Sequence, residues 1–151
     1  MSDSPKLVPY FVVNDAAAAI DFYKAAFGAH EQSRHAAPHS TRIMHAHLKI
    51  NDGDFMLSDD FSADRGGKSE TPLALGGTPV TIALEVEDAH AWWNRAVSAG
   101  ATVIMPLADQ FWGQRYGQFT DPFGIKWSIS QNIATPSEDE MAKAAAESFP
   151  G

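Results

Sequence analysis

The sequence predicts an α+β fold of two βαβββ modules, which form one curved mixed sheet with helices on its convex face. Each half of the chain contains a strand, a helix and a hairpin pattern in the same order, and the halves align with an offset of about 72 residues. In this alignment Asp15 matches Asp88, Gly28 lies near Gly100, and Gly53 lies near Gly124. A single module cannot cover both faces of its own sheet. Two modules side by side would therefore leave an open concave face.

The first module begins with the β-rich stretch LVPYFVV at residues 7–13. The alanine-rich stretch that follows predicts a helix, capped by either Asn14 or Asp15 and ended by Gly28. Residues 42–50 alternate in polarity and predict a strand, and the NDG turn at 51–53 followed by DFMLSDD completes a hairpin. The alternation places Met44, Ala46, Leu48 and Ile50 on one face, and His45, His47 and Lys49 on the other.

The second module repeats this order after a Gly-, Ser- and Pro-rich stretch at 61–78. We interpret that stretch as a surface connector, with a lid as the alternative. PVTIALEV predicts a strand, and Asp88 caps a helix that Gly100 ends. A short strand, a loop and a hairpin turning on DPFG at 121–124 follow. In this hairpin Phe119, Trp127 and Ile129 are predicted to face the helices.

The length of 151 residues fits one domain with a sizeable core. We expect residues 1–134 to form it, with modules at 6–60 and 79–132 and a linker at 61–78. Residues 135–151 form a tail, which is either a short helix capped by Ser137 or a frayed end.

Composition narrows the classes of function. A formal net charge of −8 disfavours nucleic acid and anionic membranes as partners. The absence of cysteine excludes disulfides, thiolate metal sites and a cysteine nucleophile. The N-terminal sequence has no signal-peptide pattern, and no stretch approaches the ~20 apolar residues of a membrane span. These features predict a cytoplasmic protein.

Two segments, VPYFVVNDAAAAIDFYKAAFGA and WGQRYGQFTDPFGIKWSI, resemble the vicinal oxygen chelate superfamily of glyoxalases, bleomycin-resistance proteins and extradiol dioxygenases. Within it, they look like the glyoxalase-like branch that is often mislabelled as a demethylubiquinone methyltransferase. No Gly-rich strand-to-helix turn supports a methyltransferase. The resemblance covers about residues 6–132. It implies a small-molecule ligand in the concave cup and a homodimer, because family members complete that face with a second chain.

The resemblance also identifies four strand positions where metal-dependent members carry His, Gln or Glu. In this chain they fall on Val8, Met56, Thr81 and Ser128. Val and Met offer neither a hard oxygen nor an imidazole, and neutral hydroxyls bind divalent metals weakly. We therefore expect no metal and no other cofactor, which argues against glyoxalase and dioxygenase chemistry.

The predicted ligand site is the concave cup, with aromatic walls and a few polar groups. Its predicted lining is Tyr10, His45, His47, Met56, Ser58, Thr81, Glu85, Tyr116, Gln118 and Ser128, with Phe111, Trp112 and Arg115 at the rim. Arg115 either holds an anionic ligand, stacks on a ring, or pairs with a carboxylate and stiffens the hairpin. The resulting hypothesis is a metal-free small-molecule-binding protein.

The alternative to a binding protein is an enzyme, namely a lyase, an isomerase or a dioxygenase. It would use a displaced metal at His45, His47 and Glu85, or an acid–base pair of Glu85 with one of these histidines. The other histidines, His30, His35, His39 and His90, are expected at the surface. The sequence identifies no catalytic residue.

Overall fold

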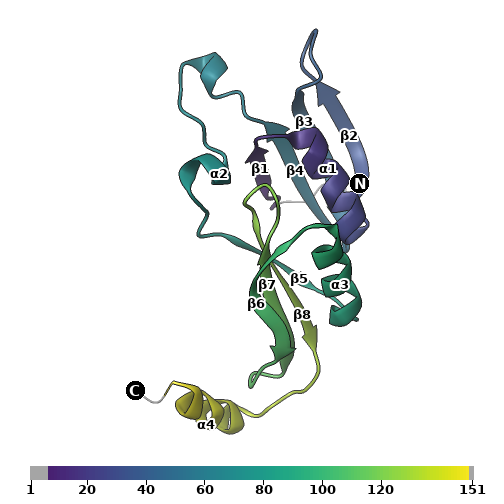
Figure 1. The fold of residues 1–151 in the computed structure, drawn as a ribbon. Coiled ribbons are helices and arrows are strands. Elements are labelled where there is room, and N and C mark those ends of the chain that lie inside the picture. The colour runs from purple at the N-terminus through teal and green to yellow at the C-terminus, as the bar shows by residue number, and fades with distance from the viewer. Residues whose placement is uncertain (1–6, 150–151) are drawn as a thin grey trace.

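The structure, a computed structural model, describes residues 7–149 and contains two βαβββ modules (Figure 1). The first comprises β1 (Tyr10–Val13), α1 (Ala16–Phe27), β2 (His30–Ala36), β3 (Ile43–Ile50) and β4 (Gly53–Asp59). The second comprises β5 (Thr81–Glu85), α3 (Ala89–Ala99), β6 (Thr102–Asp109), β7 (Gln114–Thr120) and β8 (Lys126–Asn132). The predicted α+β class with two such modules is confirmed. The predicted start of the first module at Lys6 lies outside the described residues.

Each module builds its own mixed sheet. The strand orders are β1-β4-β3-β2 and β5-β8-β7-β6, and in each sheet the first pair is parallel and the others antiparallel. Over residues 7–149, no backbone ladder joins the two sheets. The predicted curved sheet is therefore divided into two four-stranded halves, whose edge strands β1 and β5 line a common groove described below.

Two helices lie on the same side of the sheets and pack against each other (Figure 1). Asp15 caps α1 and Asp88 caps α3, as predicted. The core beneath them is continuous across the modules, because the Trp127 ring of β8 lies 4.8 Å from Phe27 and 5.5 Å from Tyr23 of α1. Phe119, Trp127 and Ile129 are fully buried, as their alternation predicts.

Arg95 of α3 makes a second link between the modules, at the carboxyl end of α1. Its guanidinium donates to the carbonyl oxygens of Ala25 at 2.7 Å and Lys24 at 3.2 Å. A cation is favourable there because the last carbonyls of a helix lack partners inside the helix and carry partial negative charge. Gly28, at φ 64°, lets the chain leave the helix directly beside this side chain.

Asp121, at the start of the DPFG turn, joins both modules through one buried carboxylate. One oxygen accepts from the backbone N–H of Phe123 and Ile125, at 2.9 and 3.0 Å, which closes the turn. The other accepts from the Tyr23 hydroxyl at 2.6 Å and the Trp127 indole N–H at 2.9 Å. Burial raises the pKa of the Asp121 carboxyl, and burial next to Asp121 raises that of Tyr23.

The prediction for Met44 is wrong. Ile43 takes the buried position, at 1% exposed, whereas Met44 is 46% exposed. The register of β2 against β3 shifts between His35 and Ala36, so β3 has one extra residue there. This bulge turns Met44 outward.

The connector at 61–78 contains two short elements that the sequence pattern did not predict, η1 (Ala63–Arg65) and α2 (Pro72–Leu75). The tail forms a helix, α4 (Glu138–Ser148), whose Ser137 and Glu140 make a reciprocal capping box. It extends from the far end of the second module (Figure 1). None of the helices within residues 7–149 is long and apolar enough to cross a membrane.

Replacing Asp121 with alanine is expected to lower the free energy of unfolding by more than about 3 kcal/mol. The substitution leaves the buried donors of Tyr23 and Trp127 without an acceptor, and each such loss costs about 1–3 kcal/mol. Urea denaturation measures the change. Asp109→Ala, which removes an exposed carboxylate, is the control and should unfold close to wild type. Equal stability of the two variants would contradict the role assigned to Asp121.

Candidate functional site

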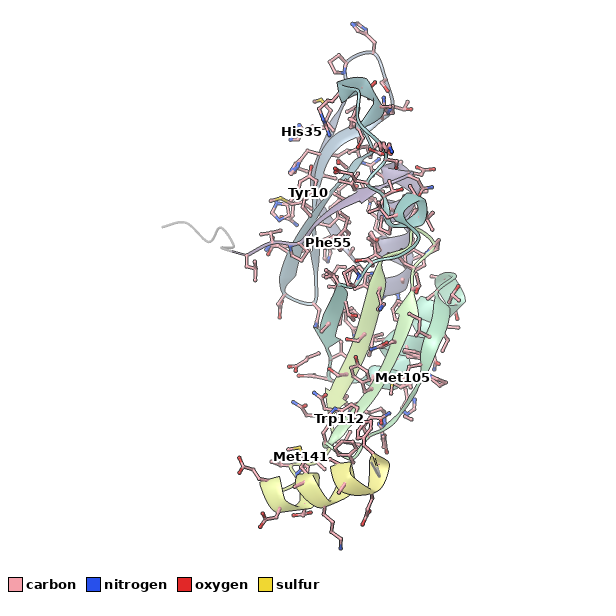
Figure 2. All side chains as sticks on the ribbon, turned by 90° about the vertical axis from the view of Figure 1, so that its left-hand side faces the viewer. Tyr10, His35, Phe55, Met105, Trp112 and Met141 are labelled. Atoms are coloured by element: carbon pink, nitrogen blue, oxygen red, sulfur yellow. The ribbon has the colours of Figure 1, made fainter. Side chains whose placement is uncertain are left out.

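The predicted ligand residues of the first module lie together on the sheet face opposite the helices. Tyr10 is in register with Met56, and Met56 with His47. The Tyr10 hydroxyl lies 3.3 Å from Nδ1 of His45, and Ser58 follows two residues after Met56 on the same face. Tyr10 is about half exposed, so its ring is accessible from the open side (Figure 2).

Two further side chains on this face were missed in the sequence. Asp54 accepts from His47 Nε2 at 2.5 Å and from the Lys49 ammonium at 3.0 Å, and these bonds, that of Lys49 first, lower the pKa of Asp54. The ring of His35 stacks 6.4 Å from that of His45. The tight turn at 51–52 sets a register in which Lys49 lies opposite Asp54. This register could have predicted that Asp54 lies on the same face as His47 and Lys49.

The predicted residues of the second module form a separate polar and aromatic group. Tyr116 accepts from Gln118 Nε2 at 2.9 Å, and Gln118 is in register with Ser128. The Trp112 ring lies 5.7 Å from Tyr116 and 5.2 Å from Phe111, in the loop that joins β6 to β7. Thr81 belongs to the same sheet, at the start of β5.

Within residues 7–149 these two groups lie apart (Figure 2). Tyr10 lies in the first module, whereas Trp112 lies at the far end of the second module, next to α4 (Figure 2). The cavities that contain Tyr10 include neither Trp112 nor Tyr116.

The alternative metal site at His45, His47 and Glu85 is not formed within the chain. The backbone oxygen of Glu85 accepts from Asn51, at the hairpin turn, and His45 lies six residues before Asn51, about 20 Å along the strand. Among residues 7–149, no three His, Asp or Glu side chains converge in an arrangement that could hold a metal ion. The same separation excludes an acid–base pair of Glu85 with His45 inside one chain.

Arg115 follows the third of its predicted alternatives. Its guanidinium pairs with Asp109 at 2.8 Å, and this hydrogen bond raises the pKa of Arg115 and lowers that of Asp109. Alternation along β7 places Arg115 on the opposite face of the sheet from Tyr116. The ion pair links β6 to β7, and Arg115 does not point toward the open face.

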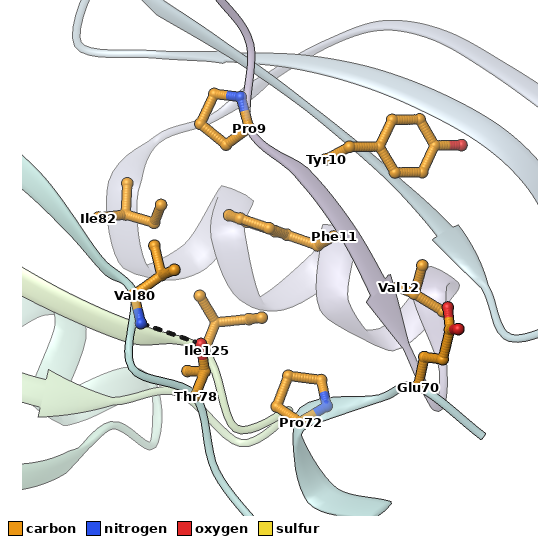
Figure 3. Close-up of a pocket in the computed structure, with 10 residues that line it drawn as sticks. All are labelled: Pro9, Tyr10, Phe11, Val12, Glu70, Pro72, Thr78, Val80, Ile82 and Ile125. Atoms are coloured by element: carbon orange, nitrogen blue, oxygen red, sulfur yellow. Dashed lines mark hydrogen bonds between the residues drawn. The ribbon is translucent and has the colours of Figure 1, made fainter. Parts of the chain in front are cut away.

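The clearest concavity along β1 lies where the two modules meet. It consists of two adjoining cavities, of about 320 and 240 Å³, which share Tyr10, Val12 and Glu70. We call it the β1 groove (Figure 3). The larger cavity is lined by Pro9, Tyr10, Phe11, Val12, Glu70, Pro72, Thr78, Val80, Ile82 and Ile125. The smaller is lined by Tyr10, Val12, Met44, Ser58, Asp59, Phe61, Ser62, Arg65 and Glu70.

The linker forms one wall of this groove, a role that its interpretation as a connector missed. Phe61, Arg65, Glu70, Pro72 and Thr78 all come from it. Its helix α2 rests on the DPFG turn, because a Cβ atom added to Gly124 would lie 2.8 Å from Cβ of Pro72. The wall is therefore fixed to the second module by a close contact that requires glycine.

The residues at the family's metal positions do not fit a divalent metal. Met56 has a thioether sulfur on the open face, Thr81 and Ser128 have neutral hydroxyls, and the Val8 side chain has no donor atom for a metal.

The paired βαβββ architecture is that of the glyoxalase-type fold, and comparison with known proteins agrees. The family model described as Glyoxalase/Bleomycin resistance protein/Dioxygenase superfamily matches residues 7–129. The chain belongs to this superfamily, as its sequence resemblance indicated.

Similar proteins occur in several bacteria. Protein Mb0911c of Mycobacterium bovis is 51% identical over 140 residues, covering 93% of this chain and 91% of that protein. The crystal structure of PA1353 from Pseudomonas aeruginosa is 27% identical with a TM-score of 0.66, covering 87% of this chain and all of that one. The PhnB protein of Bacillus cereus, named for a 3-demethylubiquinone-9 3-methyltransferase, has a TM-score of 0.64 over 84% of this chain and 99% of its own. Its 17% identity shows the fold alone.

The contact between α2 and the DPFG turn can be tested at two glycines of almost equal φ, Gly124 at 87° and Gly76 at 88°. Gly76→Ala should cost about 1–2 kcal/mol, from left-handed backbone strain alone, because its Cβ would meet open space. Gly124→Ala should cost about 1–3 kcal/mol more, because its Cβ would overlap Pro72. Urea denaturation gives both values, and equal losses would show that the turn does not hold α2.

Proposed function

We propose that this protein is a metal-free small-molecule-binding protein of the glyoxalase and bleomycin-resistance type, with its ligand in the β1 groove. The observation that carries the proposal is the groove itself. It combines apolar walls from both modules and the linker with a few polar groups, which is the usual composition of a ligand pocket. Tyr10 and Ser58, both predicted ligand residues, line it.

The absence of a metal is part of the proposal and rests on side-chain chemistry. Val8, Met56, Thr81 and Ser128 provide neither carboxylate nor imidazole at the family's metal positions. His45 and His47 are held by other groups, the Tyr10 hydroxyl and Asp54. Binding would then depend on shape, apolar contact and hydrogen bonds.

Elemental analysis tests this point. Untagged protein, incubated with zinc, nickel, manganese and iron salts and then desalted, should retain far less than one metal ion per chain. Retention of about one ion per chain would contradict the proposal. If His47→Ala abolished that retention, a displaced metal site of the kind considered for the enzyme alternative would be the explanation.

We further propose that the protein acts in the cytoplasm as a homodimer. The predicted ligand residues divide between the open faces of the two modules, one around Tyr10 and one around Tyr116. A partner related by a twofold axis can place its second module opposite the first module of this chain, so that each site combines both groups. Such a partner also covers edge strands that a monomer leaves exposed.

Light scattering is expected to give a mass about twice the 16.3 kDa of the chain at micromolar concentration. A partner that covers the open face should also bury its aromatic side chains, so Tyr10→Asp should shift the mass toward the monomer. Val97→Asp, on the outer surface of α3, is the matched control and should remain dimeric. A monomeric wild type would contradict the dimer.

Ligand binding in the groove is tested with the neutral fluorescent probe dansylamide. We expect a saturable blue shift of its emission, with about one probe per chain, because an apolar cavity removes the probe from water. Val80→Trp fills the larger cavity and should weaken binding at least tenfold. Val97→Trp changes another exposed valine away from the groove and should leave it unchanged. Equal binding by the two variants would contradict the proposed site.

A further inference from the structure

We propose that the β1 groove selects an amphipathic cation, a compact apolar body that carries an ammonium or related cationic group, and that Glu70 is the residue that recognises the charge. This inference rests on the proposed function, since it names the ligand class of the same site. It is drawn from the division of the groove into an apolar part and a part with an uncompensated carboxylate.

The larger cavity provides the apolar part. Pro72, Val80, Ile82 and Ile125 surround it from three segments, namely α2 of the linker, β5 with the residue before it, and the β7–β8 turn, and they face Val12 of β1 (Figure 3). Its volume of about 320 Å³ lies at the lower end of the range for ligand pockets. An aromatic ring system or a branched aliphatic group is therefore the kind of body that it accepts.

Glu70 lies where the two cavities join, beside Val12 (Figure 3). Within residues 7–149, no donor lies within hydrogen-bonding distance of its carboxylate, and no Lys, Arg or His lies within ion-pair distance. A bound cation would pair with the Glu70 carboxylate, which has no cationic partner among the described residues. The ring of Tyr10, on the β1 side, is about half exposed and lines both cavities, and an aromatic ring can contribute to binding a cation.

Of the two arginines near the groove, Arg42 is already engaged, whereas Arg65 makes no ion pair among residues 7–149. The Arg42 guanidinium pairs with Asp64, donates to the carbonyl of Asp60 and lies 4.0 Å over the ring of Phe61. Arg65 lines only the smaller cavity. It lies near Asp60, whose pKa is lowered to about 2 by hydrogen bonds from Ser62 and Ser69 and then by Arg65.

An anionic ligand would meet the opposite situation. Its charge would lie against Glu70 and would gain no free cation in the larger cavity. The chain's net charge of −8 adds long-range repulsion that salt screens. A neutral ligand would gain only the apolar contacts. The expected order of affinity is therefore cation, then neutral molecule, then anion.

Three probes with the same fluorophore test this order: dansylcadaverine, dansylamide and dansylglycine, which are cationic, neutral and anionic. Fluorescence titration of the full-length protein at low salt should give a Kd for dansylcadaverine about 5–10 times lower than that for dansylamide. Dansylglycine should bind more weakly than both. The ratio should shrink as salt is added, because the ion pair is partly exposed.

Glu70→Gln removes the negative charge and leaves the shape of the groove nearly unchanged. It should bring the affinity for dansylcadaverine to that for dansylamide while leaving dansylamide binding unchanged. Glu87→Gln is the matched control, because Glu87 lines a different acidic cavity with Asp52, Glu85 and Asp88, and it should retain the full preference for the cation.

The outcomes distinguish this inference from the proposed function. If dansylamide binds and Val80→Trp blocks it, but the three probes bind equally or Glu70→Gln keeps the preference, the cation inference is overturned and the groove stands. If Glu87→Gln alone removes the preference, the cation binds in the other acidic cavity and the inference is again overturned. If none of the probes binds, both proposals fail.

Discussion

The buried carboxylate of Asp121 is the interaction on which the arrangement of this protein depends. Its four hydrogen bonds join the turn between β7 and β8, the indole of Trp127 and the hydroxyl of Tyr23, which lies 98 residues earlier on α1. A buried polar group is favourable only when it is fully paired. The two modules must therefore keep one relative position to satisfy it, and Arg95 at the end of α1 constrains the same position from α3.

This constraint explains why a groove forms along β1. With Trp127 packed against Tyr23 and Phe27, the core is shared across the modules, yet the edge strands β1 and β5 carry no ladder between them. Apolar side chains from both edges face the gap, and the linker covers part of it, with α2 held against Gly124. The turn that contains Asp121 thus has two roles. Asp121 holds Tyr23 and Trp127 of the core through hydrogen bonds, and Gly124 contacts α2 in the wall of the groove.

Much of the local structure could be predicted from the sequence. Asp15, Asp88, Gly28 and Gly100 mark the helix ends, and the DPFG turn and the faces of Phe119, Trp127 and Ile129 follow from turn chemistry and alternation. These features depend on neighbours a few residues away. Met44 shows where this reasoning fails, because a bulge against β2 shifts the alternation by one residue and no local signal in β3 marks it.

The sequence by itself determined the repeat of two βαβββ modules and the polar or aromatic character of the open faces. Only the tertiary structure decided which of those faces share a cavity. It separated Tyr10 from Trp112 and His45 from Glu85, paired Arg115 with Asp109, and brought Glu70 of the linker beside Val12. The physical reason is that periodicity encodes which side of an element is buried, whereas the contacts that build the groove join segments tens of residues apart. Their positions are set by how the two modules pack around Asp121 and Trp127.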